Sequence, residues 1–231
     1  MSYMDELVTT VRDRLADLGY DVTDLEEATA AFKRANGFRD RPYPGPLTIA
    51  SLFSASAKPA AVSDALGGPP PWYDELYAVL GMHERSDNAE LRAWLSSDGA
   101  TLGDPAQFPW CGDGVQTAIK RALPDEPVPA NPYLAMNWAS WGVKVEPTMG
   151  AVMSFWRGSP TSIYGHVALY AGEDSEAYHV LGGNQSNAVT ITRIAKNRLR
   201  KNGCRWPSTY PLPGSGRIQR DAVGALSTNE A

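Results

Sequence analysis

Residues 107–123 read QFPWCGDGVQTAIKRAL and place Cys111 at the start of a pattern typical of a helix. Backbone N–H groups in the first turn of a helix favour negative charge, and they therefore favour the thiolate form of a cysteine there. Gly112 and Gly114 leave room for a substrate backbone beside the sulfur. Cys111 is therefore a candidate nucleophile. The alternative is that it fills apolar space in the core, as most free cysteines do.

A nucleophilic thiol needs a base, and the chain has three histidines, His83, His166 and His179. Residues 166–184 predict two strands joined by the turn GEDSE. If the hairpin folds about Ser175, His166 faces Asn184 on one side of the sheet and His179 points to the other side. Cys111, His166 and Asn184 would then supply the parts of a Cys-His-Asn nucleophilic site. The other interpretation of Asn184 is a turn residue in GGNQSN.

The elements that must position these residues follow from changes in hydrophobic spacing along the chain. Residues 1–55 contain three short amphipathic helical patterns, and residues 56–71 have the Ala, Ser, Gly and Pro content of a linker. Residues 72–215 predict helices first and strands after Gly150, which indicates an α+β domain with helices packed on an antiparallel sheet. We expect residues 216–231 to form a flexible tail.

The composition narrows the classes of function. The net charge of −5 argues against a nucleic-acid-binding protein. Residues 193–205 are a local exception, with six Lys or Arg and no acid. This segment is either a solvated surface or a patch that binds an anionic polymer. No apolar run approaches the ~18 residues of a membrane span, and the N-terminus lacks the pattern of a secretory signal. We expect a monomer with no cofactor or metal, with both cysteines as thiols.

Four segments of the second domain, PWCG, YGHVALYAG, VLGGNQSNAVTI and CRWP, together resemble the CHAP/NlpC-type papain-like cysteine hydrolases of phage lysins. The resemblance covers about residues 72–213. It implies a papain-like fold and cleavage of amide bonds in peptidoglycan, with Cys111 as nucleophile, His166 as base and Asn184 as third member. The chain departs from the family where Gly-Asp follows the cysteine, and where Gly182 stands at a position that some relatives give to a catalytic glutamate.

The first 55 residues resemble the small three-helix peptidoglycan-binding domain, through VRDRLADLGY, ATAAFKRANGF and PGPLTIASLF. This resemblance implies that peptidoglycan is the partner and that the module raises the local concentration of substrate. With no secretory signal, the combination favours a phage endolysin that stays in the host cytoplasm until it is released to the periplasm and cell wall. A tail-associated hydrolase and a secreted antibacterial hydrolase are the alternatives.

Further residues are candidates for binding substrate. We expect Trp110 and Tyr164 to line the substrate groove, and Gln107 to complete the oxyanion hole beside the Cys111 backbone N–H. Cys204 has no helix start behind it, and we interpret it as structural, with a Cys111–Cys204 disulfide left open.

Two rival functions stay open at the level of sequence. A zinc amidase would need several histidine ligands, but His166 and His179 fall on opposite faces of the hairpin and His83 is far away in sequence. A non-catalytic wall-binding or structural protein is the rival of another class.

Overall fold

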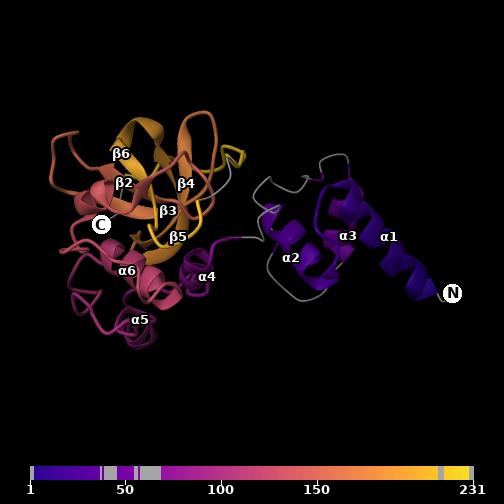
Figure 1. Cartoon of the computed structure of the whole chain (residues 1–231), viewed down its shortest axis with the longest axis horizontal. Coiled ribbons are helices and arrows are strands. Elements are labelled where there is room, and N and C mark those ends of the chain that lie inside the picture. The colour runs from indigo at the N-terminus through magenta and orange to yellow at the C-terminus, as the bar shows by residue number, and fades with distance from the viewer. Residues whose placement is uncertain are drawn as a thin grey trace. The chain divides into compact units, whose positions relative to one another are not determined.

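The computed structural model describes residues 3–36, 38, 46–54, 57, 69–212 and 216–228. The chain divides into two compact units, Met1–Gly68 and Pro69–Ala231, which Figure 1 shows with their elements labelled. The boundary falls within the predicted linker, residues 56–71, most of which lies outside the described residues.

The first unit contains the helices α1 (Tyr3–Asp17), α2 (Leu25–Ala35) and α3 (Pro46–Leu52). Asp24 caps α2 by accepting hydrogen bonds from the backbone N–H groups of Glu26 and Glu27 at 2.9 and 3.1 Å. A small apolar core joins the three helices and consists of Val11, Leu15, Tyr20, Ala28, Phe32 and Leu52. Each predicted helical pattern of this region therefore has an observed helix.

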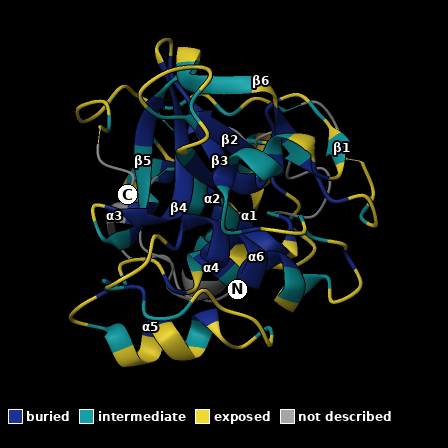
Figure 2. Ribbon diagram, turned by 90° about the vertical axis from the view of Figure 1, so that its left-hand side faces the viewer, coloured by how far each residue is buried: buried dark blue, intermediate teal, exposed yellow. Residues whose placement is uncertain are grey.

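The second unit is an α+β structure around a six-stranded antiparallel sheet, as the change of hydrophobic spacing predicted. The strand order is β1-β6-β2-β3-β4-β5. The strands are β1 (Val143–Lys144), β2 (Val152–Trp156), β3 (Gly165–Glu173), β4 (Ala177–Gln185), β5 (Ala188–Ala195) and β6 (Leu199–Trp206). The central strands β2, β3 and β4 are almost wholly buried, so the sheet is the core of this unit (Figure 2).

The helical elements of the second unit are α4 (Pro71–Tyr77), α5 (Asn88–Leu95), α6 (Cys111–Ala122), η2 (Ala135–Ser140) and η3 (Lys196–Arg198). Helix α6 packs against β3 and β4 and is buried over most of its length, whereas α5 exposes one side to solvent (Figure 2). The N-terminal end of α6 is thereby brought to the two strands that carry the predicted base and its partner.

The hairpin formed by β3 and β4 has the predicted register in its middle. Tyr170 faces Val180 and Leu169 faces Leu181, as predicted, but nearer the turn the pairing shifts between Tyr170 and Gly172, so that Gly172 faces His179 and Glu173 faces Tyr178. The pairing of β4 with β5 then shifts between Gly182 and Gln185, and Asn184 has a φ of 57°. Such an irregularity inserts a residue and moves the following side chains to the other face of the strand.

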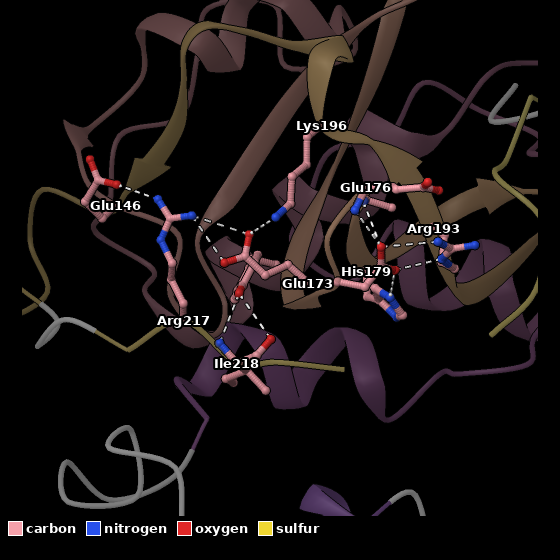
Figure 3. A network of polar contacts seen from close by, with 11 residues as sticks. Glu146, Glu173, Glu176, His179, Arg193, Lys196, Arg217 and Ile218 are labelled. Atoms are coloured by element: carbon pink, nitrogen blue, oxygen red, sulfur yellow. Dashed lines mark hydrogen bonds and ion pairs between the residues drawn. The ribbon is translucent and has the colours of Figure 1, made fainter. Parts of the chain in front are cut away.

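Part of the C-terminal segment, which was expected to form a flexible tail, contacts the sheet through residues 217–220. The Glu173 N–H donates to Ile218 O at 2.7 Å, and the Arg220 N–H donates to Glu173 O at 2.7 Å. The buried Glu173 carboxylate also pairs with Arg217 at 3.2 Å and with Lys196 at 2.9 Å (Figure 3). Residues 213–215 and 229–231 lie outside the described residues.

Deleting residues 216–231 should therefore destabilise the second unit. The deletion removes Arg217 from the buried Glu173 carboxylate and exposes backbone groups of β3, a loss of about 3 kcal/mol in the free energy of unfolding. Denaturation in urea measures the loss, and a chain that lacks only residues 229–231 is the control. An unchanged unfolding midpoint in the longer deletion would show that the segment does not stabilise the sheet.

Candidate active site around Cys111

Cys111 is the first residue of α6, as predicted, and it is only 5% exposed. The backbone N–H of Val167, in β3, is near enough to Cys111 to favour the thiolate and to lower the pKa of the thiol. Since Val167 follows His166 directly, the fold brings the thiol beside the backbone of the predicted base. Burial raises the pKa of the Cys111 thiol, against the opposing effects of the nearby N–H groups and of the Arg157 charge. The expected low pKa is therefore wrong for this structure, because the helix start is covered by the core, and the resting residue is a neutral thiol.

His166 lies in β3 and is fully buried, with its Nε2 at 3.0 Å from Gln185 Oε1. The Gln185 side-chain nitrogen donates to Thr190 O at 2.6 Å and to Thr190 Oγ1 at 3.1 Å. A backbone carbonyl only accepts, so the amide nitrogen must face Thr190 and the amide oxygen must face the imidazole. In the neutral form of the ring, Nε2 therefore carries the proton and Nδ1 holds the lone pair that a base requires.

Gln185 makes the hydrogen bond that was expected from Asn184. Asn184 is buried and directly precedes Gln185, at the irregular part of the strand. The physical reason is the irregularity in β4, since a regular strand would have placed Asn184 on the face of His166 and the extra residue gives that place to Gln185. The sequence signal was the adjacent pair Asn184-Gln185, but a register derived from the turn alone selects the wrong member.

Two adjacent glycines in β4 make room for two rings. A Cβ at Gly182 would lie 3.2 Å from His166 Nε2 and 2.8 Å from the Ala168 Cβ, and a Cβ at Gly183 would lie 2.3 Å from the Trp110 ring. Gly182 is the position where some members of the resembled family carry glutamate, and here no larger side chain fits without displacing its neighbours. The glycines therefore fix how closely His166 and the start of α6 approach β4.

Comparison of the chain with protein-family models, with characterised proteins and with solved structures gave no match. The case for a function therefore depends on the residues of the site and on the resemblance in its motifs.

The three residues predicted to bind substrate differ in how far they are exposed to solvent. Trp110 is 1% exposed and donates to Glu84 Oε2 at 3.1 Å, so it is a core residue and the expectation that it lines a groove is not supported. Tyr164 is 63% exposed, directly before β3, and can contact a substrate. Gln107 is exposed, and its side chain donates to Asp104 at 3.4 Å; its role in an oxyanion hole stays a prediction.

His179 belongs to a separate polar cluster on β4 and β5. Its Nε2 lies 2.7 Å from Asp174 Oδ2, and Arg193 Nε donates to the same oxygen at 2.8 Å (Figure 3). The Arg193 guanidinium holds the pKa of Asp174 far below its ordinary value, while burial lowers the pKa of His179. His179 is thus a neutral donor to an ionised carboxylate and has a structural role.

Across the residues described, there is no group of three or more His, Cys, Asp or Glu side chains arranged to hold a metal ion. His83 pairs through its backbone with Ala188, at the start of β5. No helix in the described ranges has both the length and the hydropathy of a membrane span.

Cys204, the competing thiol, is a buried residue of β6 that faces Met153 of β2. Burial raises its pKa to about 12. Both cysteines are free, so the structure contains no Cys111–Cys204 disulfide. The interpretation of Cys204 as a structural residue agrees with this position.

Asp113, two residues after the thiol, is a buried carboxyl that the sequence did not single out. Its Oδ2 accepts from Thr101 Oγ1 and from the Leu102 N–H, both at 3.0 Å, while Oδ1 has no hydrogen-bond partner among the described residues. Burial raises the pKa of Asp113 from 3.8 to about 6 despite those two hydrogen bonds. The departure Gly-Asp after the cysteine thus places a group that titrates close to neutral pH in the first turn of α6.

Asp113→Asn should remove a pH dependence of stability. Because the folded pKa is raised, the folded state binds the proton more tightly, and stability falls as pH rises from about 4 through about 6. Relative to wild type, the variant should gain about 2–3 kcal/mol of unfolding free energy between these limits. Urea denaturation at several pH values measures this, with the exposed Asp125→Asn as control. A constant difference between Asp113→Asn and wild type would contradict the raised pKa.

Proposed function

We propose that the chain is a cysteine-dependent hydrolase that cleaves an amide bond of bacterial peptidoglycan. The observations that carry the proposal are the start of α6 at Cys111, packed against the strand that holds His166, and the His166 ring with its Nε2 at 3.0 Å from Gln185 Oε1. A neutral thiol beside a neutral imidazole with its lone pair on Nδ1 is the starting state for general-base catalysis.

The proposed reaction has two stages. As the Cys111 sulfur attacks the carbonyl carbon, Nδ1 of His166 takes the thiol proton, and backbone N–H groups at the start of α6 stabilise the oxyanion, a contribution of about 3 kcal/mol per donor. The C–N bond then breaks, and His166 gives the proton to the leaving amine. Water attacks the thioester with His166 as base, which releases the carboxylic acid and restores the thiol.

The antiparallel sheet with α6 against β3 and β4 supports a papain-like fold for the second unit, since that fold sets a cysteine at a helix start beside a histidine on a strand. The first unit, with its own apolar core, supports a separate peptidoglycan-binding module. Together with the resembled motifs, this organisation fits a phage endolysin that acts on the wall after release from the host cytoplasm.

Digestion of purified sacculi tests the proposal. The chain should release soluble fragments, and each cut should create one new amino group and one new carboxyl group, which mass spectrometry of the fragments locates in the wall. Release of fragments with new reducing sugar ends would indicate a glycosidase instead. Binding to sacculi without any release would favour the non-catalytic alternative.

A further inference from the structure

The loop between β2 and β3 lies next to the predicted base. Phe155 faces His166 across the two strands, Trp156 faces Gly165, and the Arg157 N–H donates to Tyr164 O at 3.1 Å. Since side chains alternate along a strand, Arg157 continues the side of the sheet that Phe155 shares with His166. The positive charge of Arg157 also acts on the Cys111 sulfur, where it opposes the effect of burial on the thiol pKa. Arg157 is therefore placed at the site by two different observations.

The loop, residues 157–164, is held in place by basic residues of η3 and β6. Arg200 Nη2 donates to Ser162 O at 2.7 Å and to Tyr164 O at 2.9 Å, and Arg198 Nε donates to Trp156 O at 3.2 Å. These bonds use part of the basic segment 193–205 to position the loop. The loop nevertheless exposes two large side chains, Ile163 at 54% and Tyr164 at 63%.

The charge of Arg157 is not matched by an acid. Among the described residues no carboxylate lies within ion-pair distance of its guanidinium, whereas Arg121 and Arg193 each pair with one carboxylate and Arg217 pairs with two. A half-buried guanidinium is suited to a planar carboxylate, which it binds with two parallel hydrogen bonds. An arginine whose positive charge has no carboxylate partner, near a candidate nucleophile, favours a substrate that carries a negatively charged group.

We propose that Arg157 binds a carboxylate of the substrate next to the scissile amide, while Ile163 and Tyr164 contact the apolar part of the same peptide. The inference rests on the proposed function and narrows its substrate to stem peptides that carry a free carboxylate close to the bond that is cut. Arg157 is thus a specificity-determining residue, and the amidated form of the same peptide is the poorer substrate.

Alkylation of Cys111 tests the anion site without any cell wall. Iodoacetate carries a carboxylate and iodoacetamide does not, so the ratio of their rates at Cys111, relative to the ratio at glutathione, reports an adjacent cation. We expect Arg157→Met to lower this ratio about tenfold, Arg157→Lys to lower it less, and Arg92→Met, on the exposed side of α5, to leave it unchanged. An equal ratio in wild type and Arg157→Met, or no labelling of Cys111 by either reagent, would overturn the proposal.

A second test compares the rates at which the chain digests sacculi with free stem carboxylates and sacculi with amidated ones. Wild type should digest the carboxylated wall faster, and Arg157→Met should lose this preference by slowing on that wall alone. An equal loss on both walls would contradict a specificity role for Arg157. If the alkylation ratio depends on Arg157 but no wall is digested, the anion site stands and the peptidoglycan function fails. If walls are digested and neither test depends on Arg157, the function stands and the anion site fails.

Discussion

Cys111→Ser should reduce the release of fragments from sacculi by about 10³-fold or more, because a hydroxyl in this buried position is a far weaker nucleophile than the thiol. The substitution changes one atom in a residue that is 5% exposed, at the start of α6. The unfolding midpoint should therefore change little. Fragment release and urea denaturation are measured on the same preparation.

Cys204→Ala is the matched control for this prediction. It removes the other buried thiol, from β6, and should leave fragment release close to the wild-type rate. Wild-type activity in Cys111→Ser, or equal losses in both variants, would remove Cys111 from the role of nucleophile.

Gln185→Leu should lower the rate of hydrolysis by about 10- to 100-fold, mainly in kcat, because the imidazole loses the acceptor that fixes its tautomer. Gln185 is a positioning residue, and its loss should also change the pH profile of kcat, since His166 is then free to carry its proton on either nitrogen. Steady-state kinetics on a soluble stem peptide measure both effects, and a urea titration reports any loss of stability from the Thr190 contacts.

Asn184→Gly is the counterpart in the same strand. It removes the amide that the hairpin register predicted as the partner of His166, and glycine suits the φ of 57° at this position. Activity close to wild type is expected. Two results together would assign the orienting role to Asn184 instead. Asn184→Gly would lower the rate of hydrolysis as much as Gln185→Leu does, and Gln185→Leu would leave the pH profile of kcat unchanged.

The sequence was sufficient for the features that depend on local spacing. The helix at Cys111, the α+β organisation and the pairing of Tyr170 with Val180 all follow from periodicity and one turn. The partner of His166 did not follow, because the pairing of β4 with β5 shifts between Gly182 and Gln185, beside a contact of Gly183 with the distant Trp110 ring that local spacing does not predict. The alternation of side chains predicts which residues face each other only where the strand is regular.

Burial is the second property that local sequence did not reveal. The thiol pKa of Cys111 was expected to fall at a helix start, but α6 lies within the core and burial raises it. The segment 216–228 has the composition of a tail, yet Arg217 and Ile218 bind Glu173 and Tyr170, more than 40 residues earlier. Such contacts follow from the completed sheet, and single-segment composition does not predict them.

The most direct measurement is the activity that remains as Cys111 is progressively alkylated in the wild-type chain. Iodoacetamide is added in steps, peptide mass spectrometry gives the modified fraction of each cysteine, and fragment release from sacculi gives the activity. The account predicts that activity falls in proportion to modification of Cys111 and reaches zero when that residue is fully modified, with Cys204 still a thiol. Hydrolysis that persists after complete modification of Cys111 would contradict it.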